Sequence, residues 1–132
     1  MELQSEIQLA LYTALTGDAT LMALITAVYD DVPMKTAYPY VVIGDCTWLY
    51  WDTDTTTGGE ATCTLHTWSR YSGRLEVKNI QKAIYNVLHR KPLSLSAGLA
   101  IDNFVEFAET YMDVDGETRH GVQRLRIITI DG

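Results

Sequence analysis

The chain has 132 residues, of which 47% are hydrophobic and 20% are charged, and its formal net charge is −7. This length fits one domain, residues 1–132, and the apolar fraction excludes a disordered chain. The acidic balance argues against a protein that grips nucleic acid through a basic surface. The sequence has neither an apolar run of membrane-spanning length nor a basic signal peptide at MELQSEIQLAL, so we expect a cytoplasmic protein with no membrane contact.

The first quarter of the chain predicts two helices and a short strand. Apolar residues recur at helical spacing within Glu2–Thr16, which predicts an amphipathic helix, at Leu3, Ile7, Leu11, Ala14 and Leu15. A second, shorter helix is expected at Thr20–Ile25. The β-branched and aromatic residues of Val28–Val32 then predict a brief strand.

The middle of the chain predicts a long β-hairpin. Tyr40–Asp52 is rich in β-branched and aromatic residues and has Gly44 in its interior, which indicates a bulged strand. Glu60–Trp68 alternates strictly, with Ala61, Cys63 and Leu65 on one face and Thr62, Thr64, His66 and Trp68 on the other. The intervening TDTTTGG has no apolar anchor, so we expect residues 52–60 to be mobile.

The last part predicts a helix and a second hairpin. An apolar stripe runs through Arg74–Arg90, and Ser72 is a plausible N-cap for that helix. Two strands follow, about Asp102–Val114 and Gly121–Asp131. Because hairpins rather than helical crossovers join most strands, we predict an α+β fold with an antiparallel sheet and helices packed on one face.

The segment TLHTWSRYSG, from Thr64 to Gly73, has the residue types of a catalytic site but not its geometry. His66 and Trp68 share a strand face, Ser69 points to the other, and no G-x-S-x-G turn presents a nucleophile. A small hydrolase using His66 with Asp45 or Asp52 is therefore the weaker reading, and a structural or interface role is favoured. A ligand-binding module is a further alternative.

Metal, cofactor and disulfide signals are weak. The aspartate pairs at 30/31, 52/54 and 113/115 fit turns better than a calcium loop, and the three histidines have no ligand spacing, so no cofactor or metal is predicted. Cys46 and Cys63 do not form a C-x-x-C pair, and we interpret them as two small buried side chains rather than a disulfide.

Several residues suggest a surface that a partner covers. Trp48 and Tyr50 share one face of the first long strand, and Leu49 and Trp51 share the other, so both faces of a small protein's hairpin carry apolar side chains. Arg124 and Arg126 share one face of the last strand, where they either pair with Glu106 or Glu109 or contact another subunit. The candidate interface residues are Trp48, Tyr50, Trp51, Asp52, Asp54, Glu60, His66, Trp68, Arg124 and Arg126.

Three blocks of the sequence resemble one family. VYDDVPMKTAYPYVVIGD, LHTWSRYSGRLEVKNIQKAIYNVL and HGVQRLRIITI are similar, in that order, to signatures of phage tail-terminator, or tail-completion, proteins. One departure is Thr26-Ala27, where relatives often have glycines, and it affects only the local turn.

The resemblance implies a structural protein of long-tailed phages or phage-derived particles, with no catalytic residues and a small α+β fold. It implies a homo-oligomer, a hexameric ring on the finished tail tube at the virion's tail–head junction, assembled in the bacterial cytoplasm. The implied partners are the major tail tube protein and a head-completion or connector protein, with DNA passing through the ring without specific binding. Another neck or head-completion component is the alternative within the same class.

Overall fold

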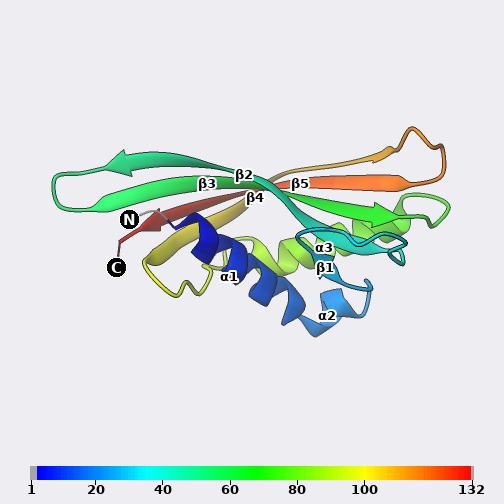
Figure 1. Cartoon of the computed structure of the whole chain (residues 1–132), viewed down its shortest axis with the longest axis horizontal. Helices are drawn as coiled ribbons and strands as arrows, with labels where there is room; N and C mark the ends of the chain where they lie inside the picture. The colour runs from blue at the N-terminus through cyan, green and yellow to red at the C-terminus, as the bar shows by residue number, and fades with distance from the viewer. Residues whose placement is uncertain (1–2, 132) are drawn as a thin grey trace.

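Within residues 3–131, which the computed structural model describes, the chain forms a long five-stranded sheet with three helices packed against it (Figure 1). In chain order the elements are α1 (Gln4–Thr16), α2 (Ala19–Met22), β1 (Val28–Tyr29), β2 (Tyr40–Asp52), β3 (Thr57–Ser69), α3 (Leu75–Leu88), β4 (Leu99–Met112) and β5 (Arg119–Ile130). In space the strands follow the order β1-β2-β3-β5-β4.

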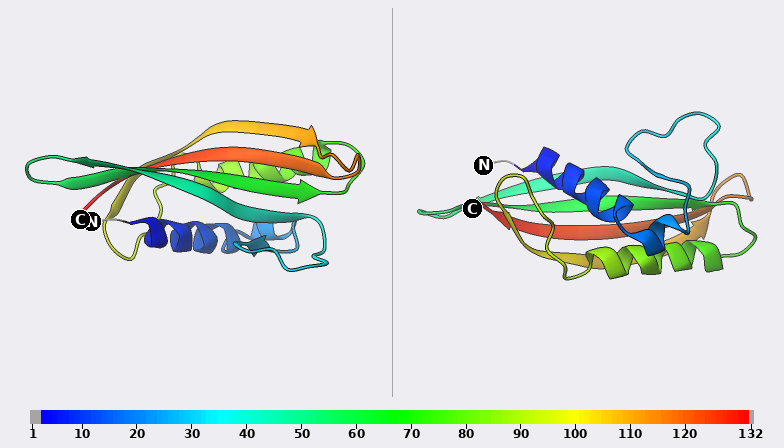
Figure 2. Two further views of the ribbon diagram at one scale, coloured as in Figure 1. Left: turned by 45° about the horizontal axis from the view of Figure 1, so that its top comes forward. Right: turned by 90° about the horizontal axis from the view of Figure 1, so that it is seen from below.

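The predicted α+β fold is confirmed. Strands β2, β3, β5 and β4 pair antiparallel, and the helices lie on one side of the sheet (Figure 2). The exception is β1, which pairs parallel with β2 and is only two residues long, so the predicted strand Val28–Val32 was too long. None of the helices in the described part of the chain is long and apolar enough to cross a membrane.

The core lies between the sheet and the helices. Alternate residues of β3 and β5 face it, and α1 and α3 each contribute one apolar stripe. Its largest fully buried members include Ile7, Leu11 and Leu15 of α1, Leu65 of β3, Ile80, Ile84 and Leu88 of α3, and Leu125 and Ile127 of β5. This arrangement confirms the helical spacing read in both long helices, although the predicted start at Glu2 lies outside the described residues.

The long hairpin has the predicted first strand and bulge, but its end is better anchored than predicted. The β2–β3 register shifts between Ile43 and Cys46, around Gly44, and pairing then continues to Asp52 opposite Thr57. The expectation that no apolar residue holds residues 52–60 is wrong. A Cβ at Gly58 would lie 2.5–2.7 Å from the Trp51 ring, and one at Gly59 would overlap the Trp48 ring, so each glycine lies under a tryptophan of the opposite strand. Mobility stays a prediction for the turn at residues 53–56 alone.

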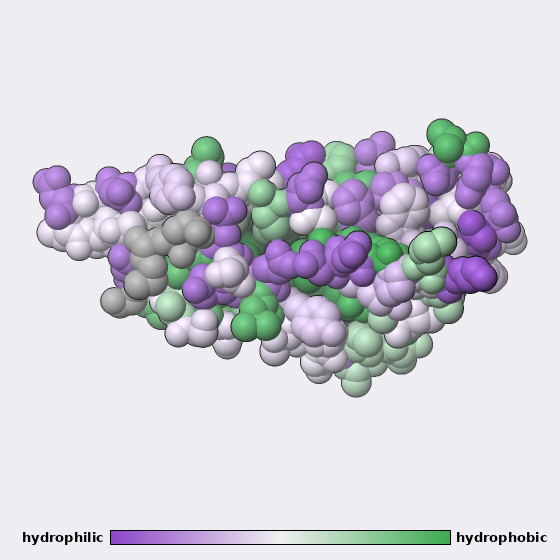
Figure 3. Space-filling view, viewed as in Figure 1, coloured by the Kyte–Doolittle hydropathy of each residue, from purple (hydrophilic) through white to green (hydrophobic). Residues whose placement is uncertain are grey.

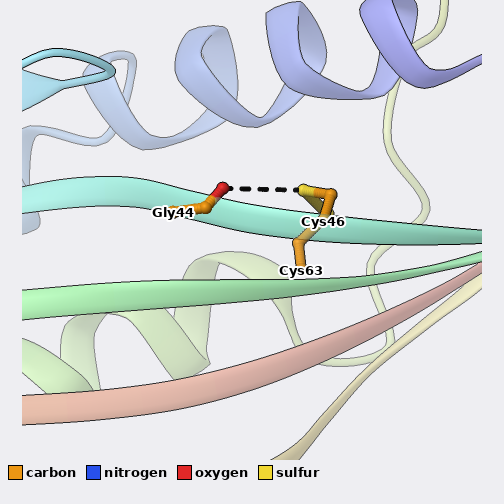
Figure 4. Close-up of a disulfide and its surroundings, with 3 residues drawn as sticks. All are labelled: Gly44, Cys46 and Cys63. Atoms are coloured by element: carbon orange, nitrogen blue, oxygen red, sulfur yellow. Dashed lines mark hydrogen bonds between the residues drawn. A yellow bond between two sulfur atoms is a disulfide. The ribbon is translucent and has the colours of Figure 1, made fainter.

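The cysteines form a disulfide, so the prediction of two separate thiols is wrong. Cys46 and Cys63 are directly opposite each other where the β2–β3 ladder resumes after the bulge, and the bond joins the two strands there (Figure 4). The Sγ of Cys46 also lies 3.9 Å from the carbonyl oxygen of Gly44, which is a contact and not a hydrogen bond because a disulfide sulfur carries no proton. The bulge hides this pairing in the sequence, because it offsets the simple count of residues along the two strands.

The corner between β3 and α3 also differs in detail from the prediction. Ser72 does not cap α3, which begins at Leu75 after Arg74, and no side chain accepts a hydrogen bond at that N-terminus. Gly73 has a φ of +110°, a conformation that residues other than glycine rarely adopt. The turn itself therefore determines where the helix starts. The helix ends at Leu88, two residues before the predicted Arg90.

Candidate interface on the uncovered sheet face

The side of the sheet opposite the helices has no cover from the described chain, and we call it the open face (Figure 2). Strand residues alternate between faces, and paired residues share a face, so the strand register identifies its members. On β3 and β5 they are Glu60, Thr62, Thr64, His66, Trp68, His120, Val122, Arg124, Arg126 and Ile128. On β2 and β4 they include Leu49, Trp51, Phe104, Phe107, Glu109 and Tyr111. The structure thus brings five predicted interface residues of β3 and β5 onto one surface.

An aromatic cluster occupies one end of the open face. Nδ1 of His66 lies 2.7 Å from Nε2 of His120, so one ring donates its N–H to the other. The His120 ring stacks on Trp68 with centroids 3.8 Å apart, and Tyr111 meets the same imidazole at 4.8 Å. Sequence reasoning identified His66 and Trp68 but missed His120 and Tyr111. These two residues could have been found only from the position of β5 between β3 and β4, because that position places His120 opposite both Trp68 and Tyr111.

Both histidines of this cluster resist protonation. Burial, and after it the neighbouring His66, lower the pKa of His120 to about 4, because two adjacent imidazolium ions would repel each other. Burial also lowers the pKa of His66, with the Asp45 carboxylate acting in the opposite direction. At neutral pH the pair is therefore uncharged, held by one shared hydrogen bond, and acts as part of a packed aromatic surface.

The geometry does not fit a hydrolase. Ser69 is fully buried on the helix side of β3, where its hydroxyl donates to Oε1 of Glu76 at 2.5 Å. The nearest hydrogen-bond partner of His66 is His120 and not an aspartate, and Asp52 lies at the opposite end of β2. A nucleophile, a base and an orienting acid therefore do not meet at His66.

The two arginines of β5 are held by aromatic rings and carboxylates. Nε of Arg126 lies 3.4 Å from Glu60 and 3.9 Å from Glu106, which confirms the cross-strand pairing expected for Glu106. The Arg126 guanidinium also lies 5.3 Å from the centre of the Phe104 ring, and that of Arg124 lies 4.8 Å from Phe107. Sequence reasoning missed both phenylalanines, because their contacts depend on a bulge in β4 between Val105 and Phe107.

The remaining candidates lie at the end of the long hairpin and divide between two faces. Trp51 is 37% exposed on the open face, whereas Trp48 points to the helix side and packs against the core. Tyr50 shares the Trp48 face, meets its ring at 6.0 Å and is 66% exposed. Asp52 and Asp54 are exposed at the tip. Trp48 therefore belongs mainly to the core of the monomer, while the others are accessible to a partner.

The acidic pair Asp113 and Asp115 forms a turn, as the sequence indicated, whereas Asp52 lies in strand β2. Asp115 accepts hydrogen bonds from the backbone N–H groups of Glu117 at 2.9 Å and Thr118 at 2.8 Å, and from the Thr118 hydroxyl at 2.6 Å. These donors lower the pKa of Asp115 to about 2. Among residues 3–131, no group of three or more histidine, cysteine or acidic side chains could hold a metal ion.

Comparisons with known proteins point to one family. The model of the family described as tail completion protein gp17 matches residues 9–130. Tail completion protein gp17 of Bacillus phage SPP1 is 29% identical over 106 residues, which are 80% of this chain and 78% of that protein.

Two solved structures share the fold. A chain from the virion of a native gene transfer agent particle matches with a TM-score of 0.88 and 26% identity, over 97% of this chain and 96% of that one. The structure of bacteriophage SPP1 gp17 matches with a TM-score of 0.64 and 28% identity, over 93% and 88% of the two chains.

Proposed function

The chain belongs to the tail completion protein gp17 family, and from that premise we propose that it is a structural virion protein and not an enzyme. In this proposal residues 1–132 form one tail-terminator-like domain, and copies of it close into a hexameric ring on the head-proximal end of the tail tube. The ring stops tube polymerisation and forms the joint to the head connector. The observation that carries the proposal is the family match over residues 9–130.

The open face supports an assembly role. It carries aromatic, apolar and charged side chains that nothing in the described chain covers, and exposed patches of this kind are common at protein interfaces. We propose that it contacts the major tail tube protein, a head-completion protein or a neighbouring subunit. The open-face residues proposed for these contacts are Trp51, Glu60, His66, Trp68, Arg124 and Arg126. Tyr50, Asp52 and Asp54 lie at the end of the hairpin outside that face, and we propose that they contact the same partner, with Trp48 packed against the core behind them.

The charge of the chain suits a passage for DNA. With a net charge of −7, a ring of these subunits repels phosphates, so DNA passes through it without specific binding. The protein would be assembled in the bacterial cytoplasm and would remain at the tail–head junction of the particle.

Deleting the gene and imaging the particles tests the proposal. We expect tails of irregular length and heads without tails, and normal particles after expression of the protein in trans. Tails of normal length that fail to join heads would favour another neck component. Normal, joined particles without the protein would contradict the proposal.

The enzyme alternative has its own test. We expect no esterase, phosphatase or nuclease activity above that of buffer in a generic panel. Activity that His66→Ala removes while the fold remains intact would contradict a purely structural role.

A further inference from the structure

An apolar groove lies between α1 and the outer edge of β2. It has a volume of about 410 Å³ and is lined by Ser5, Gln8, Leu9, Tyr12, Asp30 and Ile43. Leu9 is 60% exposed and Tyr12 is 45% exposed, so two large side chains of α1 face solvent there. Apolar surface is visible between the sheet and the helices on this side of the molecule (Figure 3). The volume falls within the usual range of binding sites.

The β2 edge beside this groove is open, whereas the opposite edge of the sheet is protected. The short strand β1 pairs only with Val41 and Val42, and beyond them no strand in the described chain pairs with the outer side of β2. At the other edge, β4 has two bulges, and its backbone is hydrogen-bonded to residues of α3 and of the segment directly after α3. Its Asn103 carbonyl accepts from the Arg90 N–H, its Val105 N–H donates to His89, and its Glu109 carbonyl accepts from Gln81. Beyond Val42 the outer side of β2 therefore has fewer backbone contacts than that of β4 and is accessible to another chain, although β2 is itself bulged between Ile43 and Cys46.

The corner at the start of α3 has the complementary character. Tyr71 is 56% exposed and Leu75 is 65% exposed, and they flank the turn at Gly73. Arg74 and Lys78 lie beside them, are exposed, and have no side-chain partner within residues 3–131. The corner is thus an apolar pair accompanied by two free cations. Tyr71 and Gly73 of this corner belong to the segment TLHTWSRYSG, and neither of them lies on the open face.

The distribution of charge matches these two surfaces. The first 56 residues contain eight acidic residues and one lysine, while the remaining 76 contain nine acidic and nine basic residues, so the whole net charge of −7 belongs to the first part. Helices α1 and α2 and strands β1 and β2, including the groove, all come from that part. Asp30, on the groove rim, is exposed and unpaired within the described residues. The groove is thus apolar with one free carboxylate, Asp30, on its rim. The corner is apolar with two free cations, and its one carboxylate, Glu76, accepts a hydrogen bond from Ser69.

We propose that the groove of one copy receives the Tyr71–Leu75 corner of a second copy of this chain. This inference rests on the proposed ring, for which it identifies the subunit contact. The contact joins two different patches on one chain, as a closed ring requires. Tyr71 and Leu75 pack against Leu9 and Tyr12, and the cations of the corner approach Asp30.

This contact is weak between two free subunits. A groove of this size accepts only a few side chains, far less than the roughly 800 Å² per partner of a standard stable interface. In the ring each subunit makes the contact twice while also touching the tail tube, so the contacts reinforce one another. The protein in dilute solution is then monomeric, and pairs form only at high concentration.

Mixing two complementary variants tests the contact. Leu9→Asp disables the groove and Leu75→Asp disables the corner, and because both leucines are mostly exposed, both variants are expected to fold. Neither variant binds itself, but ¹⁵N-labelled Leu9→Asp mixed with unlabelled Leu75→Asp forms a pair that cannot grow. We expect NMR shift changes confined to residues 71–78 of the labelled protein, and reversing the label moves them to residues 5–12 and Ile43. Val114→Asp, which changes an exposed side chain outside both surfaces, serves as the matched control and behaves as the native chain does.

Charge reversal provides the second measurement. Asp30→Lys and Lys78→Glu should each weaken the contact about tenfold, and combining Asp30→Lys on one partner with Lys78→Glu on the other should restore it. Two outcomes of the mixing experiment overturn the inference: no shift changes at about 1 mM in the complementary mixture, or changes that map to the open face instead. A six-fold layer built on tails by Leu75→Asp also overturns it but leaves the proposed function intact. The absence of any layer with the native protein would overturn the proposed function itself.

Discussion

Strands β3 and β5 carry two different surfaces, one on each face of the sheet. On the helix side, Leu65, Leu125 and Ile127 have at most 1% of their surface exposed, and they bury the core. On the open face, the intervening residues form the stacked histidine–tryptophan cluster and the arginine–aromatic contacts, and apart from the buried His120 they remain at least partly exposed. Alternate residues of the same strand therefore have different roles. One set stabilises the monomer, and we propose that the other serves assembly.

The largest contrast is expected between Leu125→Ala and Val122→Ala, which alter opposite faces of β5. Leu125 is fully buried, so its truncation leaves a cavity and should lower the free energy of unfolding by about 2–5 kcal/mol. Val122 is partly exposed on the open face, and its truncation should cost less than about 1 kcal/mol. Urea unfolding of the two variants measures the difference, and equal losses would show that the open face is a second core.

Acid should weaken the open face through its histidines. Because the pKa of His120 falls to about 4 in the folded chain, the unfolded chain binds protons more readily as pH drops below 6.5. This contribution to the free energy of unfolding is complete above pH 6.5 and is lost progressively down to about pH 4, by about 3 kcal/mol for a shift of this size in His120. His120→Phe retains a stacked ring without a titrating group, so its unfolding free energy should vary less over this range. An unchanged pH dependence would contradict this assignment.

Two glycines at the end of the hairpin, Gly58 and Gly59, differ in how firmly the tryptophan above each of them is packed. A Cβ at Gly59 meets Trp48, including Cη2 at 2.6 Å, and Trp48 is packed against the core, so Gly59→Ala should cost about 1.5 kcal/mol. A Cβ at Gly58 meets Trp51, which can turn outward into solvent, so Gly58→Ala should cost less. Thermal unfolding of both variants decides the order, and the reverse order would mean that Trp51 is the more firmly packed ring.

The smallest effect on stability, and the largest on assembly, is expected for Trp51→Asp. This side chain contacts Gly58 across the hairpin end but is 37% exposed, so the loss should remain below about 1 kcal/mol. Joining of heads to tails should nonetheless fail if a partner covers this face. Thermal unfolding and counts of joined particles measure the two effects separately. Unfolding of the monomer would place Trp51 in the core instead.

Periodicity in the sequence predicted much of the fold because its long elements repeat regularly. The residues of Tyr40–Asp52 and the alternation of Glu60–Trp68 both determine which side chains share a face, and the structure has the same division. The parallel strand Val28–Tyr29 could not be predicted as parallel, because two residues give no pattern that fixes their direction.

The site was less accessible to sequence reasoning, because its contacts depend on register. The disulfide between Cys46 and Cys63 follows from a bulge, and the anchoring of Gly58 and Gly59 follows from their pairing opposite aromatic residues. His120 belongs to the cluster because β5 lies between β3 and β4, and no local sequence pattern predicts this strand order. Composition identified the aromatic residues as unusual, but only the pairing of strands shows which of them meet.

A cryo-electron-microscopy reconstruction of the head-proximal end of tails assembled with this protein tests the proposed ring and its subunit contacts most directly. We expect one six-fold layer of subunits there, with the groove of each subunit facing the Tyr71–Leu75 corner of the next and the open face covered by a partner. Density along the tube shaft or at the distal tip would contradict the proposed position. A layer whose open faces all remain exposed to solvent would contradict the division of the strands into a stabilising face and an assembling face.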